Sequence, residues 1–209
     1  MPSANFLDAV PSKKRRRMIH NLFILGSPRR NGNSETMARI VAEYLSQTPL
    51  NGVDYIHTAS LNISPCVSCG GCSKTGKCII DDDMAPLYEK IDAADRIFFV
   101  SPVYFYAMSA QIKTFIDRCQ ALWSRRYLLG KRHPQKAHRT GHLLSCAATG
   151  GDQIFTGSTL TIKCLCDTLD LHYSPPLLIK DIDSADDLAK NPEKIAACKT
   201  YGENIVSGS

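Results

Sequence analysis

Short apolar runs alternate along the chain with segments whose apolar residues recur at helical spacing. The runs predict five strands, at 20–26, 53–59, 96–100, 142–148 and 172–179. The helical spacing predicts five helices, at 34–46, 84–93, 110–123, 157–169 and 192–206. Strands that alternate with helices predict an α/β fold, in which helices cover both faces of a five-stranded parallel sheet. The strand order 2-1-3-4-5 is one common form of such a sheet.

The length of 209 residues, with 44% hydrophobic and 22% charged residues, fits one α/β domain, which we place at 18–209. The apolar runs are too short for a membrane span. A basic arm, 1–17, ends in the run Ser12–Arg17 and lacks the apolar segment of a secretory signal. It fits an acidic partner or nucleic acid, but one short basic run is more simply a solvated arm, and we expect neither nucleic acid nor membrane as a partner.

The segment between the first strand and the first helix, Gly26–Ser34, is rich in groups that bind phosphate. Ser27, Asn33 and Ser34 can donate hydrogen bonds, Gly32 permits close backbone approach, and Arg29 adds charge. The segment matches neither the NTP-binding P-loop nor the dinucleotide motif. It therefore predicts a phosphate at the positive end of a helix, against the alternative of an ordinary capped turn.

Two further segments follow strands and belong to the same end of the predicted sheet. The aromatic segment Ser101–Ser109 is bracketed by Pro102 and a helix-start signal, which predicts an exposed loop. The segment 149–152 contains two glycines, which allow a ligand to approach the backbone. A phosphate loop, an aromatic loop and a glycine-rich loop suit a mononucleotide with a planar head, and FMN fits that description better than NAD.

Four of the nine cysteines are separated by two, two and five residues in a loop that we place at 62–83: Cys66, Cys69, Cys72 and Cys78. Gly70, Gly71 and Gly76 let the chain fold back so that several sulfurs face one point. The spacing fits an iron–sulfur cluster, a zinc ion or a loop of unmodified cysteines. The other five, Cys119, Cys146, Cys164, Cys166 and Cys198, lie in apolar segments and are expected to be buried. So many cysteines without a secretion signal predict a reducing, cytoplasmic compartment.

The motifs Gly-Ser-Pro-Arg-x-x-Gly-Asn-Ser, the four-cysteine run that ends in Cys78-Ile-Ile-Asp-Asp-Asp-Met84, and Ser-Pro-Val-Tyr-Phe together resemble the NAD(P)H-dependent FMN reductases, in particular their iron–sulfur flavoprotein branch. The resemblance spans about residues 18–206. It implies a flavodoxin-like three-layer sandwich and a subunit that pairs in a homodimer or homotetramer with FMN near the interface. It also implies NAD(P)H as an electron donor and a [4Fe–4S] cluster.

Carried over residue by residue, the resemblance places three groups around FMN and one around the cluster. The phosphate is expected at Ser27, Arg29, Asn33 and Ser34. The ring and ribityl chain are expected along Pro102, Val103, Tyr104 and Phe105, with Thr149, Gly150, Gly151 and Asp152 at the other edge. The cluster ligands are Cys66, Cys69, Cys72 and Cys78. Because the flavin performs the chemistry, no catalytic acid or base is assigned.

A basic insertion, 124–142, contains six arginines and lysines, three histidines without metal-ligand spacing, and no acid. It fits recognition of the NADPH phosphate or docking of an acidic, ferredoxin-like electron-transfer partner, and equally a solvated surface loop or a loop that pairs subunits. Three flavin-based functions remain open: an FMN oxidoreductase that passes electrons through a cluster, a cluster-free NAD(P)H:quinone or FMN reductase, and a non-enzymatic electron carrier. In the first, the cysteine loop would lie on the same carboxyl-end side of the sheet as the flavin.

Overall fold

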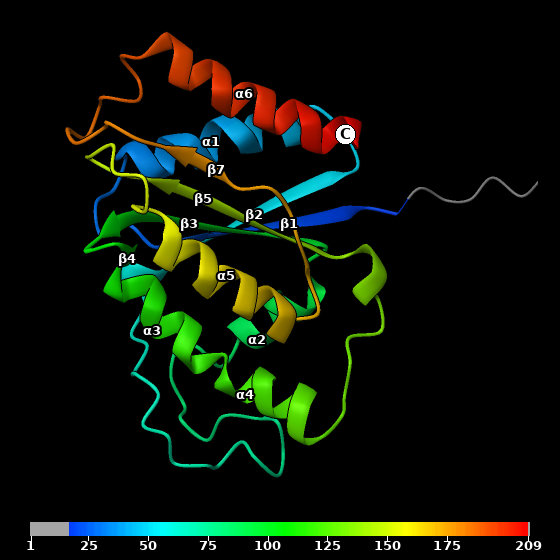
Figure 1. The fold of residues 1–209 in the computed structure, drawn as a ribbon. Coiled ribbons are helices and arrows are strands. Elements are labelled where there is room, and N and C mark those ends of the chain that lie inside the picture. Colours follow the sequence, from blue (N-terminus) through cyan, green and yellow to red (C-terminus); the bar gives the residue numbers. More distant parts are fainter. Residues whose placement is uncertain (1–16, 209) are drawn as a thin grey trace, which may run out of the picture.

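The computed structural model describes residues 17–208, which fold around one sheet (Figure 1). Its strands are β1 (Ile19–Leu25), β2 (Asn51–His57), β3 (Arg96–Tyr104), β4 (Ala107–Met108), β5 (Thr140–Cys146), β6 (His172–Tyr173) and β7 (Leu177–Ile179). The order is β2-β1-β3-β5-β6, with β7 also paired to β5 and the short β4 antiparallel to β3. The predicted fold class and the predicted order 2-1-3-4-5 are confirmed, since β6 and β7 share the fifth position.

The fifth strand is interrupted where the sequence pattern predicts a continuous one. Pro175 and Pro176 lie between β6 and β7. Proline has no N–H to donate to a neighbouring strand, so the ladder stops there. β6 therefore pairs with the start of β5, and β7 pairs with its end.

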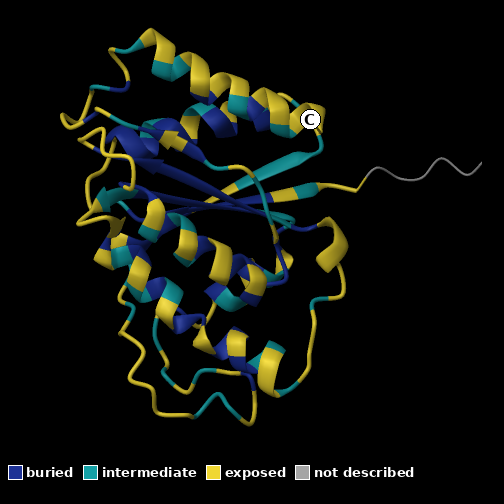
Figure 2. Ribbon diagram, in the orientation of Figure 1, coloured by how far each residue is buried: buried dark blue, intermediate teal, exposed yellow. Residues whose placement is uncertain are grey.

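Helices form a layer on each side of the sheet (Figure 1). One layer contains α1 (Asn33–Ser46) and α6 (Pro192–Ser207), and the other contains α2 (Leu87–Ala93), α3 (Ala110–Arg118), α4 (Gln120–Trp123) and α5 (Thr156–Thr168). Side chains of β1 alternate between the two layers: Leu22 and Ile24 belong to one buried cluster, and Phe23 and Leu25 to the other. The sheet is accordingly the most buried part of the molecule (Figure 2).

Two local expectations from the sequence were wrong. The helix expected at 110–123 is divided at Cys119 into α3 and α4 and continues as a π-helical turn, Ser124–Leu128. Cys164 is exposed on α5 rather than buried, whereas Cys119, Cys146, Cys166 and Cys198 are buried as expected. All nine cysteines are free thiols in the described residues.

The aromatic segment forms a hairpin rather than an irregular loop, because β3 continues to Tyr104 and turns back through β4. Phe105 and Tyr106 form the turn, with φ of 51° and 61°, in the left-handed region that side chains other than glycine rarely adopt. The side chain of Phe105 is fully exposed, while Ser109 is buried and donates a hydrogen bond to the Gly26 carbonyl. Only the tip of this segment is therefore exposed as predicted.

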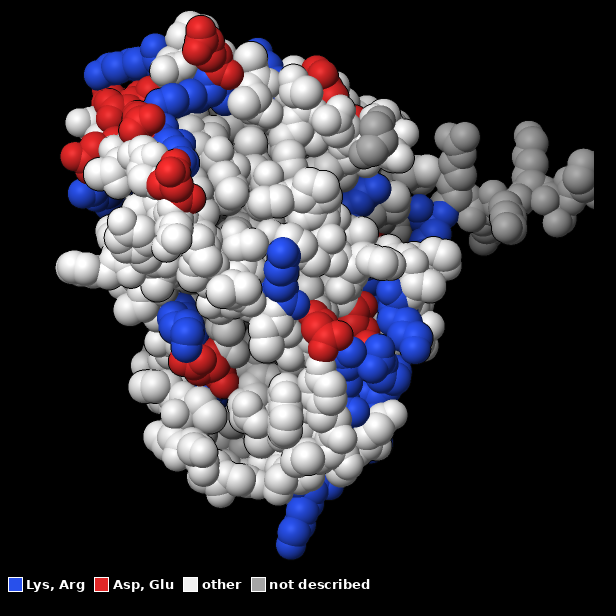
Figure 3. Space-filling model, viewed as in Figure 1, with Lys and Arg blue, Asp and Glu red and all other residues white. Residues whose placement is uncertain are grey.

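The arginines of the basic insertion are largely paired within the chain. Arg125 makes two 2.6 Å hydrogen bonds to Asp92, and Arg126 contacts Asp167 at 2.6 Å. Arg139 is buried, and its guanidinium donates to three main-chain carbonyls. Blue and red groups accordingly lie against one another on the lower right of Figure 3. The insertion is thus tied to the fold, and much of its charge is neutralised.

The basic run of the N-terminal arm lies outside the described residues except for Arg17, which forms an ion pair with Asp95 at 2.8 Å. Among residues 17–208, no helix combines the length and the apolar composition that crossing a membrane requires.

His142 of β5 is a buried part of the sheet. Its ring stacks on Phe98 with the centroids 4.6 Å apart, and Nδ1 lies 3.0 Å from the Tyr201 hydroxyl. Burial, assisted by the positive charge of Arg96, lowers the pKa of His142 from 6.5 to about 3. The imidazole is therefore neutral in the folded protein.

We expect the free energy of unfolding to fall by about 1.4 kcal/mol for each pH unit below 6.5, because only the unfolded chain takes up a proton there. This contribution is complete above pH 6.5 and decreases until about pH 3. Urea unfolding across this range measures it. His142→Gln should flatten the pH dependence, while the matched change at the exposed His138 should leave it unchanged. An equal slope in wild type and His142→Gln would show that another group is responsible.

Candidate functional site

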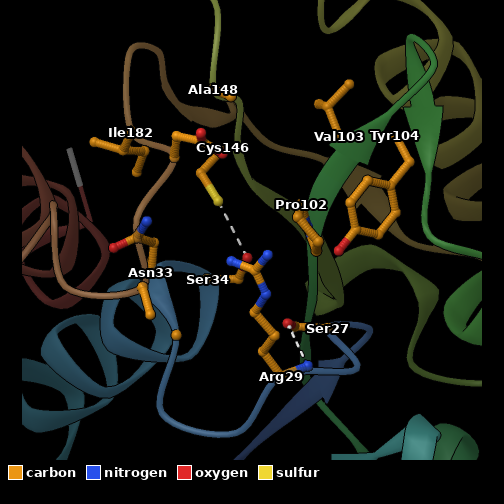
Figure 4. A pocket seen from close by; sticks show the side chains of 13 residues that line it. Ser27, Arg29, Asn33, Ser34, Pro102, Val103, Tyr104, Cys146, Ala148 and Ile182 are labelled. Carbon is orange, nitrogen blue, oxygen red and sulfur yellow. Dashed lines mark hydrogen bonds between the residues drawn. The ribbon is translucent and has the colours of Figure 1, made fainter.

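The strands β1, β3 and β5 end at the same edge of the sheet, since Leu25 is in register with Val100 and Val100 with Leu144. A cavity of about 90 Å³ opens at this edge, beside the start of α1 (Figure 4). It is lined by Ser27, Arg29, Gly32, Asn33, Ser34, Pro102, Val103, Tyr104, Cys146, Ala148, Ile182, Asp183 and Ala185. The structure therefore brings seven of the residues predicted for FMN into one pocket, which we call the anion pocket.

The start of α1 supplies hydrogen-bond donors to the anion pocket. Gly32 is the N-cap, has no side chain to cap the helix, and receives the first helical hydrogen bond from the N–H of Thr36. The N–H groups of Asn33, Ser34 and Glu35 therefore have no partner in the helix. Aligned peptide dipoles add positive potential at the same point. Such a helix terminus favours a small anion such as a phosphate group.

Ser27 and Arg29 complete the pocket on the side of β1. The Ser27 hydroxyl accepts a hydrogen bond from the Arg29 N–H at 3.1 Å (Figure 4). A hydroxyl that accepts one bond still has its proton to donate, so Ser27 can donate to an anion. The exposed Arg29 side chain adds a positive charge at the mouth. Both residues thus suit the role predicted for them.

Glu35, a buried acid beside the pocket, shapes the turn before α1. Its carboxylate accepts hydrogen bonds from the Asn31 N–H at 2.7 Å and from Arg39 at 2.6 Å. Burial acts to raise the pKa of Glu35, but the hydrogen bonds from Arg39 and Asn31 outweigh it, and the pKa lies below its usual value. The carboxylate is therefore ionised, and Arg39 balances its charge, which limits repulsion of a bound anion.

Asn33 and Ser34 have partners that the sequence did not indicate. The Asn33 amide donates to the Ser184 carbonyl at 2.8 Å and accepts from the Leu188 N–H at 3.0 Å. Its side chain therefore fixes the segment between β7 and α6 instead of being free to hold a phosphate. The Ser34 hydroxyl lies 3.1 Å from the Cys146 thiol, at the end of β5 (Figure 4).

We expect Asn33→Ala to lower the free energy of unfolding by about 1–3 kcal/mol, because the buried Leu188 N–H would lose its acceptor. FMN binding should weaken with it, since Ile182, Asp183 and Ala185 line the pocket. Chemical denaturation and FMN titration measure the two effects. Asn204→Ala, on the exposed side of α6, is the matched control and should change stability by less than about 0.5 kcal/mol. A fully stable Asn33→Ala protein would contradict this role.

Five residues predicted for FMN lie outside the pocket lining. Phe105 is at the exposed hairpin tip, and Thr149, Gly150, Gly151 and Asp152 form an exposed loop after β5. Conversely, sequence reasoning missed Cys146, Ala148, Ile182, Asp183 and Ala185. The rule that ligands bind at carboxyl ends of parallel strands, applied to the fifth strand as well, would have pointed to the segment after β7.

A second cavity, of about 250 Å³, is formed by the cysteine loop. All four predicted ligands line it, together with Val67, Ser68, Gly70, Ser73, Ile79, Ile80, Arg118, Gln120, Ala121, Ser124 and Leu128. Ser68 and Gly70 adopt positive φ, which turns the chain around the hollow. The Cys72 sulfur lies 3.3 Å from the Ser124 hydroxyl. Four thiols around one hollow are a donor set that fits an iron–sulfur cluster.

Within residues 17–208, no three His, Cys, Asp or Glu side chains meet closely enough to hold a single metal ion. A structural zinc site needs such a meeting point, because its ligands surround one ion tetrahedrally. A cluster of several irons and sulfides is wider, and its ligands surround a cavity. The four cysteines line one cavity and do not meet at a single point.

The anion pocket and the cysteine cavity are separate. Their linings share no residue. α3 leads away from the hairpin at the end of β3, and the cysteine cavity abuts its last residue, Arg118, and the segment beyond. At 1.5 Å per residue, Arg118 lies about 12 Å along this helix from Ala110. The loop runs below α4, outside the helix layer (Figure 1).

The fold and the anion pocket define a flavodoxin-like α/β protein with a phosphate-sized pocket at the carboxyl edge of its sheet. Residues 20–153 match the family described as NADPH-dependent FMN reductase, and the chain belongs to that family. The resemblance seen in its motifs is thereby confirmed. The family implies FMN as cofactor.

Relatives agree with this assignment, and solved structures share the fold. The chain is 31% identical over 149 residues to an iron-sulfur flavoprotein of Methanosarcina thermophila, covering 71% of this chain and 72% of the relative. An iron-sulfur flavoprotein of Archaeoglobus fulgidus is 38% identical over 108 residues, which cover 52% of this chain and 49% of the relative. The chain thus spans about half the length of some relatives that it matches. An NAD(P)H:quinone oxidoreductase from Methanothermobacter marburgensis shares the fold, with a TM-score of 0.71 and 14% identity. The match covers 90% of this chain and 97% of that structure.

Proposed function

We propose that the protein is an FMN-dependent oxidoreductase that moves electrons between NAD(P)H, or a reduced carrier, and an acceptor. The observation that carries this proposal is the anion pocket, in a chain of the NADPH-dependent FMN reductase family. When bound, FMN would supply the redox chemistry by accepting electrons in pairs and releasing them singly or in pairs. The protein's contribution is to hold and orient it.

The FMN phosphate would be held by the free N–H groups at the start of α1, by the hydroxyls of Ser27 and Ser34, and by Arg29. Pro102, Val103 and Tyr104 line the same pocket and would contact the rest of the cofactor. The exposed loop Thr149–Asp152 and Phe105 stand outside the pocket lining and remain candidates for its outer edge. None of these groups is assigned as a proton donor or acceptor.

We further propose a [4Fe–4S] cluster held by Cys66, Cys69, Cys72 and Cys78. Two observations support it: the four thiols line one cavity, and relatives of the chain are named iron-sulfur flavoproteins. A cluster exchanges single electrons, so it would suit a one-electron acceptor such as a ferredoxin-like protein. A cluster bound by free thiols fits a reducing, cytoplasmic compartment.

We also propose a homodimer or homotetramer with FMN near an interface. Large apolar side chains are exposed at the hairpin tip and on the α4 and α5 side, among them Phe105, Trp123 and Leu160, and they are the kind of surface that subunit contacts cover. The basic insertion is less suited to docking an acidic partner than its sequence indicated, because most of its arginines are paired within the chain.

A cluster-free reductase that acts on quinones is the second candidate. It is supported by the fold that the chain shares with the NAD(P)H:quinone oxidoreductase from Methanothermobacter marburgensis. Anaerobic mixing with NADPH and with NADH tests the shared part of both proposals. Bleaching of the flavin absorbance within seconds by either nucleotide is expected, and flavin that stays oxidised with both would contradict NAD(P)H as donor. Sustained turnover with a quinone in protein free of iron would favour the second candidate.

A further inference from the structure

Arg118, the last residue of α3, is an arginine with no exposed side-chain surface, buried against the cysteine loop. Its guanidinium donates two hydrogen bonds to the carboxylate of Asp82, at 2.6 and 3.1 Å. It also donates to the carbonyl of Ser64 at 2.8 Å and to that of Ile80 at 3.4 Å. Such a planar, bidentate arrangement is one that lysine cannot reproduce.

These partners lie on both sides of the four cysteines. Ser64 precedes Cys66, whereas Ile80 and Asp82 follow Cys78. Asp82 closes the loop further, because its carboxylate accepts from the N–H of Ser64 at 2.9 Å and from that of Met84 at 3.0 Å. Asp82 does not cap the following helix, because α2 begins only at Leu87 and has no side-chain cap. Asp82 instead joins the two ends of the loop to Arg118.

Arg118 also belongs to the wall of the cysteine cavity. Its Nε atom is buried and has no hydrogen-bond partner among the described residues. The Asp82 carboxylate balances its charge on the side of the loop ends. An iron–sulfur cluster with four thiolate ligands is an anionic group whose negative charge increases on reduction. A fixed positive charge in the cavity wall would stabilise the reduced form.

Building on the proposed iron–sulfur site, we infer that Arg118 is its positioning residue. It holds the two ends of the cysteine loop together, so that the four sulfurs surround one cavity before any cluster is present. It also places a fixed positive charge beside the cluster, which raises the reduction potential of that site relative to FMN. Asp82 helps Arg118 to hold the loop ends together. Its negative charge, however, lowers the reduction potential of the cluster, which opposes the effect of Arg118.

The test compares Arg118→Met and Asp82→Asn in two measurements. The first is hydrogen exchange of the backbone amides of residues 62–84 in cluster-free protein. Both variants break the ion pair that joins the loop ends, so exchange should be about tenfold or more faster than in wild type, while β1 and β3 stay protected. The second is a redox titration of cluster and FMN in protein reconstituted anaerobically with ferrous iron and sulfide.

The two variants should move the cluster potential in opposite directions. Arg118→Met removes a positive charge and should lower it, while Asp82→Asn removes a negative charge and should raise it. A merely structural role would shift both in the same direction through loosening of the loop. Arg118→Lys should keep most of the wild-type potential but lose the exchange protection. The FMN potential, measured in the same samples, should change less than the cluster potential in every variant.

Arg125→Met is the matched control. Arg125 also makes a bidentate pair with an aspartate and packs against Gly76 of the loop, but its side chain is 31% exposed and it does not line the cavity. It should alter neither measurement appreciably. If Arg118→Met fails to fold, Asp82→Asn and Arg118→Lys still decide the question. Hydrogen exchange of residues 62–84 that is unchanged in both Arg118→Met and Asp82→Asn would overturn the inference. Cluster potentials that shift in the same direction in these two variants would also overturn it.

The outcome also separates this inference from the proposed cluster. Wild-type protein that binds neither iron nor sulfide after anaerobic reconstitution contradicts the cluster, and hydrogen exchange then decides alone whether Arg118 holds the loop. If wild-type protein binds iron and sulfide, the proposed cluster is supported. If the variants then equal wild type in hydrogen exchange and in cluster potential, the role of Arg118 is refuted.

Discussion

Replacing Ser34 by aspartate is expected to weaken FMN binding about a hundredfold or more. The substitution removes a hydroxyl that can donate to the phosphate, and a hydrogen bond to a charged group contributes about 1.5–3 kcal/mol. It also places a carboxylate among the free N–H groups at the start of α1, where it would repel a phosphate and compete for the same donors. Acidic residues in the first turn of a helix are stabilising, so the fold should persist without the cofactor.

Fluorescence quenching during titration of apoprotein with FMN measures this effect, and thermal unfolding of the apoprotein checks the fold. Gln47→Glu is the matched control, because it adds the same charge at the opposite, exposed end of α1. Its FMN affinity should equal that of wild type. If Ser34→Asp bound FMN as tightly as Gln47→Glu does, the phosphate would have to lie elsewhere.

Cys69→Ser is expected to lose nearly all iron and sulfide while retaining FMN. A serine hydroxyl is a poor substitute for a thiolate in an iron–sulfur site, so the content should fall from about four irons per chain towards zero. FMN should remain, since Cys69 lines only the cysteine cavity, which shares no residue with the anion pocket.

Iron, sulfide and flavin analysis of anaerobically reconstituted protein measures the loss. Cys164→Ser provides the control, because Cys164 is an exposed cysteine on α5 outside the loop. It should keep the full iron content. Iron that is equal in the two variants would refute the assignment of Cys69 as a ligand.

The fold was predictable because its information is local and repeated. The apolar patterns of β1, β3 and β5 require burial on both faces, and the helix patterns present one apolar side, so the order of elements implies the layers. The meeting of the segments after β1 and β3 in one pocket was also predictable, since ligands in such folds bind at the carboxyl ends of the parallel strands.

The rest of the site depends on contacts between distant parts of the chain. Asn33 has the appearance of a phosphate ligand, yet it binds Ser184 and Leu188, more than 150 positions away. Arg118 looks like a surface arginine of an amphipathic helix, and only the folded loop places Asp82 beside it. The acids that pair with the basic insertion lie outside that insertion. Spacing alone reveals none of these pairings.

The most direct test of the account is the visible spectrum of protein purified without oxygen, combined with flavin, iron and sulfide analysis of the same sample. We expect flavin bands over a broad brown shoulder, with one FMN and about four irons for each chain. Flavin bands without iron would agree with FMN in the anion pocket but would contradict the iron–sulfur cluster. Colourless protein that cannot be reconstituted with FMN would contradict the central claim that the pocket at the start of α1 holds a flavin phosphate.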